Sequence, residues 1–341
     1  MSAPYTPPNL SGKVALVTGA TRGTGRGIAV ALGEAGAIVY CTGRSSRLTR
    51  KKPLAMAAQA PGGSGTDFGL RLETIDETAE RVTDRGGVGI PVVVDHSNPS
   101  AVHKLLQQIE HEQGRLDILV NDIWGGDALL EFGKPFWELD LQKGFQMMEG
   151  AIHTHVITNH FAGSLLIETA KKSRGGLIVE VTDGDSYQYR GNLFYDLVKT
   201  TVIRMAFVYA HELRRKNVAA VALTPGFVRS EVMLDHFGLT EVTWLEATRK
   251  HPDFAESETP VFSGRAVAKL AADPRIAEKS GRVFSTWNLA EEYGFCDLDG
   301  RQPNWGKYVQ QRYGGVMKPC DDAFYEYWSG GIMDAIMSDW P

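Results

Sequence analysis

The stretch that most constrains the fold of this chain is residues 14–27, which read Val-Ala-Leu-Val-Thr-Gly-Ala-Thr-Arg-Gly-Thr-Gly-Arg-Gly. An apolar run is followed at once by three spaced glycines, and a segment with helical spacing of apolar residues comes next. Such a turn points the first backbone N–H groups of the helix at one place, where a pyrophosphate binds well. The stretch therefore predicts a strand, a phosphate-binding turn and a helix.

The rest of the chain repeats the alternation of apolar runs and helical periodicity that parallel β-α-β winding requires. After the first strand, six more are expected at 38–42, 91–95, 116–121, 177–181, 218–223 and 282–284. The two longest helices are expected over much of 144–172 and from Tyr195 to Glu212. These patterns predict an α/β protein with one doubly wound parallel sheet of about seven strands, in a single domain.

Two stretches extend this domain, which we place at 1–299. Residues 45–72 are first basic and then rich in Gly, Pro and Ala, and they form either a solvated insertion or a segment that closes over an adenosine phosphate. Residues 300–341 are rich in aromatic side chains. A free aromatic tail would expose much apolar area, so we expect this extension to pack on the body or on a neighbouring subunit.

Composition narrows the classes of protein that fit. The 341 residues are 43% hydrophobic with a formal net charge of −5, which indicates a globular protein with no basic surface for nucleic acid. Cys41, Cys296 and Cys320 have no paired or metal-like spacing, so we expect free thiols and no metal. The N-terminus lacks the apolar core of a signal peptide, and no apolar run approaches the ~18 residues of a membrane span. We expect a cytoplasmic protein with no membrane partner.

A tyrosine and a lysine four residues apart supply the chemistry. Tyr195 and Lys199 fall on one face of an expected helix. A phenol has a pKa near ~10, and an ammonium about 4 Å away attracts its phenolate by ~4 kcal/mol in moderate dielectric. We therefore expect Lys199 to lower the pKa of Tyr195 by up to ~3 units before desolvation opposes it, which makes Tyr195 a usable general acid–base.

These signals, in this order, resemble the short-chain dehydrogenase/reductases over residues 10–290. The matching positions are Thr18-Gly19-x-x-x-Gly23-x-Gly25, Asp95, Asn121, Tyr195-x-x-x-Lys199 and Pro225-Gly226. Four further stretches are similar to one subgroup of that family, at 136–138, 210–215, 289–294 and 297–301. The resemblance implies a Rossmann fold and hydride transfer between a nicotinamide cofactor and a small-molecule substrate.

The resemblance also implies which residues hold the cofactor. The glycine turn cradles the pyrophosphate, Asp95 caps the adenine amine, Asn121 supports the ribose region, Lys199 holds the nicotinamide ribose, and Ser230 bonds the carboxamide. The full expected set is Gly19, Thr21, Arg22, Gly23, Thr24, Gly25, Arg44, Ser45, Asp95, Asn121, Tyr195, Lys199, Pro225, Gly226, Val228 and Ser230.

The end of the second strand decides between NAD and NADP(H). A carboxylate there accepts hydrogen bonds from the ribose 2′-hydroxyl and repels a 2′-phosphate. This chain has Gly43 and then Arg44, with no acidic residue between Ala37 and Gly65. Arg44 pairs well with a phosphate, and Arg22 adds a second guanidinium. We therefore predict NADP(H).

The chain departs from the family at the serine that hydrogen-bonds the substrate oxygen. The aligned segment, 181–186, reads Val-Thr-Asp-Gly-Asp-Ser, so Asp183, or else Thr182 or Ser186, takes that position. An anionic Asp183 would repel a developing alkoxide, whereas burial and Asp185 would keep it protonated as a donor. Pteridine reductases resemble this chain in having an aspartate there, and they reduce C=N bonds, where a carboxylate favours a cationic iminium.

Two further positions also depart from the family pattern. Gly150 replaces an asparagine that anchors a water behind the lysine, and His153 and His155 stand one turn on. Trp124 replaces a small residue after the fourth strand, where it walls the nicotinamide pocket, stacks on a planar substrate or packs in the core.

The segment at about 231–262 corresponds to the family's substrate lid. It is rich in apolar residues, which favours a bulky, largely apolar substrate or else a helix core. Met233 and Trp244 of this lid, together with Trp124, are the candidate substrate contacts.

Three functions fit the sequence. The first is an NADP(H)-dependent oxidoreductase that acts on a carbonyl or alcohol, and the second is a C=N reductase that uses Asp183. The third is an NADP(H)-binding protein with little catalysis, which intact Tyr195 and Lys199 argue against. In the family the helices over 144–172 and 195–212 form dimer faces, so a homodimer or homotetramer is expected.

Overall fold

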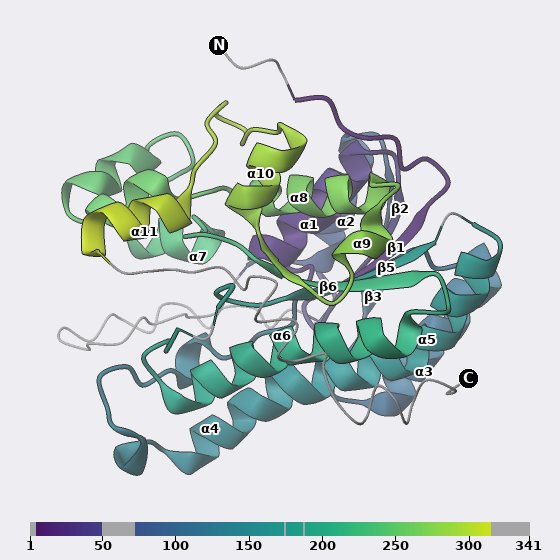
Figure 1. Cartoon of the computed structure of the whole chain (residues 1–341), viewed down its shortest axis with the longest axis horizontal. Coiled ribbons are helices and arrows are strands. Elements are labelled where there is room, and N and C mark those ends of the chain that lie inside the picture. The colour runs from purple at the N-terminus through teal and green to yellow at the C-terminus, as the bar shows by residue number, and fades with distance from the viewer. Residues whose placement is uncertain (1–4, 50–71, 174, 187, 315–341) are drawn as a thin grey trace.

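A seven-stranded parallel sheet forms the centre of the computed structural model, which describes residues 5–49, 72–173, 175–186 and 188–314 (Figure 1). The strand order is β3-β2-β1-β4-β5-β6-β7. The strands are β1 Val14–Thr18, β2 Ile38–Gly43, β3 Val88–Val93, β4 Ile118–Asn121, β5 Gly176–Val181, β6 Val218–Thr224 and β7 Val283–Ser285. Strands β2 and β3 are added on one side of β1, and strands β4 to β7 are added on the other side. The prediction of a doubly wound Rossmann-type sheet is therefore confirmed.

The third strand is the one whose position differs most from its prediction. We expected it at 91–95, whereas it pairs with β2 from Val88 onward, opposite Ile38. β3 is one of the two edge strands, and an edge tolerates Pro91 because one of its sides needs no backbone donor. All six residues of β3 are half-buried or exposed, so its start is hard to recognise from an apolar run.

Helices cover both faces of the sheet (Figure 1). One layer packs on a core that includes Ile28 and Phe262, and it holds α1 Gly23–Glu34, α2 Ile75–Asp84, α8 Pro260–Ala272 and α10 Thr286–Tyr293. The other layer packs on a core that includes Leu105 and Leu166, and it holds α3 Pro99–Gln113, α5 Thr154–Lys171 and α6 Leu193–Leu213. Two buried apolar layers of this kind are what a parallel sheet requires.

Glycines bring α1 and α8 into unusually close contact. A Cβ at Gly27 would lie 2.1 Å from the backbone of Pro260, and a Cβ at Gly264 would lie 2.4 Å from the carbonyl oxygen of Gly27. Neither position has room for a side chain, so both glycines are needed for this packing. The contact joins the glycine turn at the start of α1 to the segment that follows the lid.

The expected long helix over 144–172 is divided. It consists of α4 Leu141–Met148, a π-helical turn at Glu149–His153 and then α5. Gly150 lies in the π turn, and a Cβ there would lie 3.4 Å from the carbonyl oxygen of Trp124. The irregular turn thus packs against the loop that follows β4, where the candidate site lies, as π turns often do.

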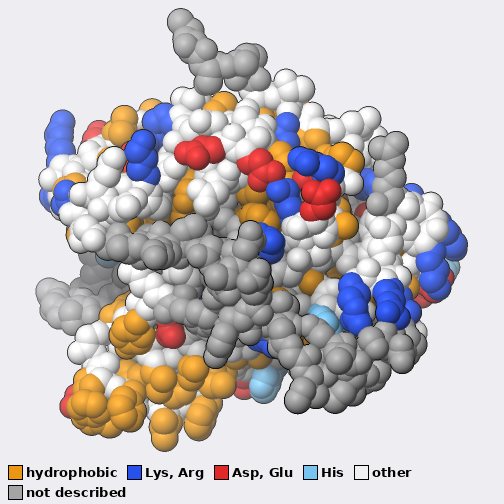
Figure 2. All heavy atoms as spheres, in the orientation of Figure 1, with side chains coloured by type: hydrophobic (Ala, Val, Ile, Leu, Met, Phe, Trp, Pro, Cys, Tyr) orange, Lys and Arg blue, Asp and Glu red, His pale blue; other side chains and the backbone are white. Residues whose placement is uncertain are grey.

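Apolar side chains gather on the surface over α4, at the lower left of Figure 2. The exposed apolar side chains of α4 and of the residues just before it include Phe136, Trp137, Leu141 and Phe145, and Trp137 is 71% exposed. A patch of this kind is typical of an interaction surface. It adjoins the helix on which the predicted homodimer or homotetramer rests, and the oligomeric state stays a prediction.

The lid and the C-terminal extension pack on each other. The lid consists of α7 Glu231–His236 and two 3₁₀ turns, Trp244–Arg249 and Pro252–Glu256. From the extension, α11 Trp305–Tyr313 places Trp305 5.6 Å from Phe227, between ring centroids. The hydroxyls of Tyr308 and Tyr313 each donate to Asp253 at 2.7 Å. The described part of the extension therefore covers the lid of its own chain.

Several predictions fall partly outside the described residues. Of the insertion 45–72, the structure describes 45–49 and 72, so its role stays a prediction. Residues 315–341 of the extension and Cys320 also lie outside, while Cys41 and Cys296 are buried free thiols. Within the described ranges no helix has the length and hydropathy to cross a membrane.

Candidate active site

The glycine turn lies at the carboxyl edge of the sheet, between β1 and α1. A Cβ at Gly19 would lie 2.4 Å from the carbonyl oxygen of Asp122, and one at Gly25 would lie 2.5 Å from that of Gly19. These two glycines are therefore required by the packing of the chain itself. At Gly23 the nearest atom to such a Cβ is 3.8 Å away, so packing does not demand a glycine there, but its positive φ of 57° favours one.

The donor chemistry of this turn fits an anion. The N–H of Gly23 donates to a carboxylate oxygen of Glu231 at 2.8 Å, and Glu231 comes from the lid helix α7. A carboxylate at the positive end of a helix occupies the kind of place that phosphate oxygens take. The N–H of Gly23 and this stand-in anion together fit the pyrophosphate of a dinucleotide. Thr24 is the next residue of the same turn.

The expected adenosine end of the site holds two arginines. Arg44 follows β2 and is exposed, and its backbone carbonyl accepts from the hydroxyl of Thr49 at 3.0 Å. Arg22 lies 3.5 Å from Glu73, between Nε and the nearer carboxylate oxygen. Thr21 packs under Gly43, where a Cβ would lie 2.4 Å from its hydroxyl. The backbone carbonyl of Ser45 accepts from Ile75 at the start of α2.

Asp95 differs from its predicted place at the end of a strand, whereas Asn121 does not. Asp95 does not end β3 but lies two residues beyond it, where hydrogen bonds from Ser97 lower its pKa. Asn121 ends β4, but its fully buried amide donates to Glu180 at 2.9 Å. The side chain of Asn121 therefore packs between strands in the interior of the sheet, and its expected support of the cofactor ribose region stays a prediction.

A buried histidine joins this interior network. His155 Nδ1 lies 2.6 Å from a carboxylate oxygen of Glu180, and its Nε2 lies 3.1 Å from the carbonyl oxygen of Ile123. His155 thus ties α5 to the end of β5 and to the loop after β4. Sequence comparison placed Gly150 at the family's asparagine, whereas the side chain that contacts this loop comes from His155, one turn later.

The tyrosine and the aspartate of the predicted site meet directly. The hydroxyl of Tyr195, on the first turn of α6, donates to a carboxylate oxygen of Asp183 at 2.6 Å. Thr182 is buried and donates to the backbone carbonyl of Lys199 at 2.7 Å. Of these two alternatives for the serine position, Asp183 therefore faces Tyr195 and Thr182 faces the α6 backbone.

The pKa of Tyr195 moves opposite to our expectation. Burial raises it, and the carboxylate of Asp183 raises it further through its charge and its hydrogen bond. We expected Lys199 to lower it, but the cost of placing a phenolate beside a carboxylate in a buried site is larger. Burial lowers the pKa of Lys199, an effect that the charges of Asp183 and Asp122 oppose.

Trp124 lies directly against the catalytic candidates. The ammonium of Lys199 lies 4.4 Å from the centroid of the Trp124 ring. The Trp124 and Tyr195 rings meet edge to face, with centroids 5.3 Å apart. An aromatic face stabilises a buried cation. Trp124 also packs against the core cluster that includes Phe194 and Val198, so it joins that core to Tyr195 and Lys199.

Sequence reasoning missed two residues that shape this site. Arg190 donates to the backbone carbonyls of Asp183 and Ser186 and pairs with Asp196 at 3.1 Å, so it holds the loop after β5. Asp122 lies between the glycine turn and Lys199, and burial raises its pKa to about 7. The sequence could have pointed to Asp122, because it directly follows Asn121 at a position where the family has another asparagine.

The turn after β6 is held from behind by a buried carboxyl group. The N–H of Gly226 donates to Glu258 at 2.9 Å, and Val228 pairs with Glu258 in a parallel bridge. Burial raises the pKa of Glu258 to about 7. Pro225 precedes this turn, and Trp305 of the extension covers it, because a Cβ at Gly226 would lie 2.8 Å from Trp305.

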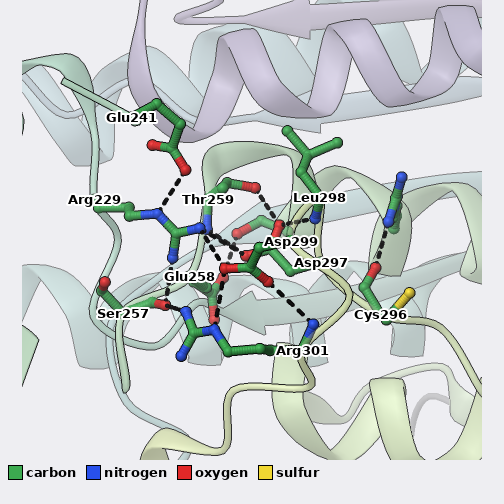
Figure 3. Close-up of polar contacts among 12 residues, drawn as sticks. Arg229, Glu241, Ser257, Glu258, Thr259, Cys296, Asp297, Leu298, Asp299 and Arg301 are labelled. Carbon is green, nitrogen blue, oxygen red and sulfur yellow. Dashed lines mark hydrogen bonds and ion pairs between the residues drawn. The ribbon is translucent and has the colours of Figure 1, made fainter. Parts of the chain in front are cut away.

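Arg229 anchors the lid to the extension (Figure 3). Its guanidinium, only 1% exposed, donates to Glu241 at 2.7 Å, to the carbonyl of Ser257 at 2.7 Å and to Asp299 at 3.0 Å. Asp297 lies 3.7 Å away. The stretch 297–301, which the sequence marked as a subgroup feature, is thus part of the lid's support.

Trp244 belongs to this support and not to the site. It is 6% exposed, and the guanidinium carbons of Arg229 and Arg301 lie 4.3 and 4.7 Å from its ring centroid. This packing corrects our expectation that Trp244 contacts substrate. Met233 packs partly against the same cluster, and Ser230 caps α7 through the N–H of Met233.

Comparison with known proteins shows the family to which the chain belongs. A family model described as short chain dehydrogenase matches residues 55–237. The chain is also 37% identical to "Dehydrogenase/reductase SDR family member 1" of Mus musculus, over 86% of this chain and 85% of that protein. The chain belongs to the short-chain dehydrogenase/reductase family. The relative confirms the subgroup that four sequence stretches indicated.

Solved structures of short-chain dehydrogenases share the fold. One from Mycobacterium thermoresistibile has a TM-score of 0.66 at 20% identity, over 87% of this chain and 93% of that one. A Beutenbergia cavernae protein with bound NADP has a TM-score of 0.60 at 22% identity, over 82% and 97%. Family membership makes the chain an oxidoreductase of the nicotinamide-dependent type that acts on a small molecule.

Proposed function

We propose that this chain is an NADP(H)-dependent oxidoreductase that transfers hydride between nicotinamide and a carbonyl or alcohol substrate. The observation that carries the proposal is the meeting of Tyr195, Asp183 and Lys199 beside the glycine turn. A reduced nicotinamide supplies hydride to the carbonyl carbon when it is bound. The glycine turn would hold its pyrophosphate, and Pro225, Gly226 and Ser230 would line the nicotinamide end.

Tyr195 is the proposed proton donor. Hydride addition leaves an alkoxide oxygen, and the reaction is balanced when that oxygen takes the Tyr195 proton. The raised pKa of Tyr195 keeps the phenol protonated at neutral pH. An alkoxide is a stronger base than an ordinary phenolate, and the raised pKa of Tyr195 narrows that difference. The phenolate that this transfer leaves lies beside Asp183 in the same way whichever direction the reaction runs.

A C=N reductase is the second candidate, and the position of Asp183 favours it. A carboxylate 2.6 Å from the tyrosine hydroxyl lies where a substrate heteroatom approaches. It would repel a developing alkoxide but stabilise a cationic iminium, which becomes a neutral amine after hydride addition. The two candidates differ in the sign of the charge that the site has to stabilise.

The preference for NADP(H) rests on Arg44. Its guanidinium lies at the end of β2 and makes no pair with the described residues, so it is free to bind a 2′-phosphate. A neighbour of the same fold holds NADP. The bulky, largely apolar substrate, the cytoplasmic location and the homo-oligomer remain proposals that follow from the sequence.

Turnover measurements on four proteins test the proposal. NADPH consumption is followed with ketones, aldehydes, quinones and cyclic imines for the wild type and for Tyr195→Phe, Asp183→Ser and Tyr189→Phe. We expect Tyr195→Phe to lose turnover by ~10²-fold or more, whereas Tyr189→Phe, which alters an exposed tyrosine, should match the wild type. Turnover that survives in Tyr195→Phe would refute the role of Tyr195.

Asp183→Ser separates the two candidates. A carbonyl reductase should gain turnover when a hydroxyl donor replaces the carboxylate, because one donor to an oxyanion is worth ~10²–10³ in rate. An imine reductase should instead lose turnover on cyclic imines. NADPH binding without turnover on any substrate would favour the non-catalytic binding role.

A further inference from the structure

Glu231 occupies the place at the glycine turn that a cofactor phosphate would need. Its Oε2 accepts from the N–H of Gly23 at 2.8 Å, and its Oε1 lies 3.3 Å from Arg26. Gly23 and Glu231 are 208 positions apart in the chain, so this contact joins the lid directly to the start of α1. The side chain of Glu231 is 27% exposed, which leaves it room to move towards solvent.

Among the described residues near it in sequence, helix α1 has none whose side chain accepts from the N–H groups of its first turn. Its N-cap residue, Arg22, makes no capping hydrogen bond through its side chain, and no residue of its first turn is acidic. The first N–H groups of a helix need acceptors, and the positive end of the helix dipole favours an anion there. Glu231 supplies that anion from the lid.

The neighbouring residues set where Glu231 points. Arg229, two positions earlier, is fixed by the buried network of Figure 3. Ser230 caps α7, and its Cβ is the nearest atom to a Cβ built at Gly23. Arg229 thus binds the extension, Ser230 caps the lid helix, and Glu231, the next residue, contacts the glycine turn. The position of Glu231 follows from this anchored backbone.

We propose that Glu231 is a latch that competes with the cofactor pyrophosphate for the α1 N-terminus and couples cofactor binding to movement of the lid. This inference rests on the proposed function, because it concerns the same site. A pyrophosphate and a carboxylate cannot share the Gly23 N–H, and their like charges repel each other. Cofactor binding therefore displaces Glu231 and releases this one contact between α7 and α1, and the latch weakens the apparent affinity by the fraction of chains in which it is closed.

Binding measurements on charge-neutral variants test the latch. Isothermal titration measures Kd for NADPH and for inorganic pyrophosphate with the wild type, Glu231→Gln and Glu246→Gln. Glu246→Gln is the matched control, because it removes the same charge from an exposed position of the same lid. Glu231→Gln should lower both Kd values by about fivefold or more, and Glu246→Gln should leave them unchanged.

The two probes separate failure of the latch from failure of the proposed function. Equal or weaker pyrophosphate binding by Glu231→Gln, or no pyrophosphate binding by any of the proteins, would overturn the latch. Tighter pyrophosphate binding by Glu231→Gln with no binding of NADPH would support the latch and refute the proposed cofactor. If Glu231→Gln does not fold, Glu231→Asp replaces it, because the shorter side chain withdraws the carboxylate from Gly23 and should also tighten binding.

Discussion

Replacement of Arg229 is the sharpest test of how the lid is held. Arg229→Ala removes a buried guanidinium from Glu241, Asp299 and the carbonyl of Ser257, and it leaves Asp297 buried without its nearby cation. Removal of one partner from a buried ion pair costs roughly 3–5 kcal/mol, because an uncompensated charge stays in the interior. We therefore expect the free energy of unfolding to fall by about 4 kcal/mol.

Urea denaturation followed by circular dichroism measures this loss. Tryptophan fluorescence is a second probe, to which Trp244 beside the deleted group contributes as one of seven tryptophans. Arg275→Ala is the control, because Arg275 has a side chain 72% exposed and lies 4.0 Å from Glu278. A surface pair of this kind contributes less than about 1 kcal/mol. An equal, small loss in both variants would refute the reasoning that the Arg229 network supports the lid.

Three further predictions concern packing, pH and cofactor choice. Gly27→Ala should destabilise the chain by at least ~2 kcal/mol in the same urea assay, because its Cβ would lie 2.1 Å from the Pro260 backbone; wild-type stability would contradict this contact. The folded pKa of Glu258 is raised from 4.5 to about 7, so the native state binds more protons than the unfolded state and stability falls as pH rises between these values. Glu258→Gln should reduce this loss in the free energy of unfolding by roughly 3 kcal/mol, measured by urea denaturation across this pH range. An unchanged dependence on pH would exclude Glu258 as its source. Arg44→Asp should reverse the preference for NADPH over NADH in binding titrations, and an unchanged ratio would refute the role of Arg44.

The core of the fold was predictable because its signals are local. The first strand, the glycine turn and α1 follow from residues 14–27, and the later strands follow from short apolar runs between helical segments. The boundaries were less certain where neighbours decide them. β3 begins earlier than predicted because its partner β2 sets the register, and Gly150 interrupts a helix whose periodicity does not show the π turn.

The sequence offered a set of candidate site positions, but it did not predict their electrostatic environment. Local spacing placed Tyr195 and Lys199 together, yet the direction of the Tyr195 pKa shift depends on burial and on Asp183 from another element. The choice between Asp183 and Thr182 likewise needed the orientation of β5 against α6.

The amino-acid sequence was sufficient to establish the α/β class and the family and to name candidate catalytic residues, because periodicity and motif spacing act over a few residues. The tertiary structure established that Trp244 supports the lid, that Asn121 faces the sheet interior and that Glu231 reaches Gly23. These contacts join residues far apart in the chain. Their geometry depends on how whole elements pack, and no local pattern encodes it.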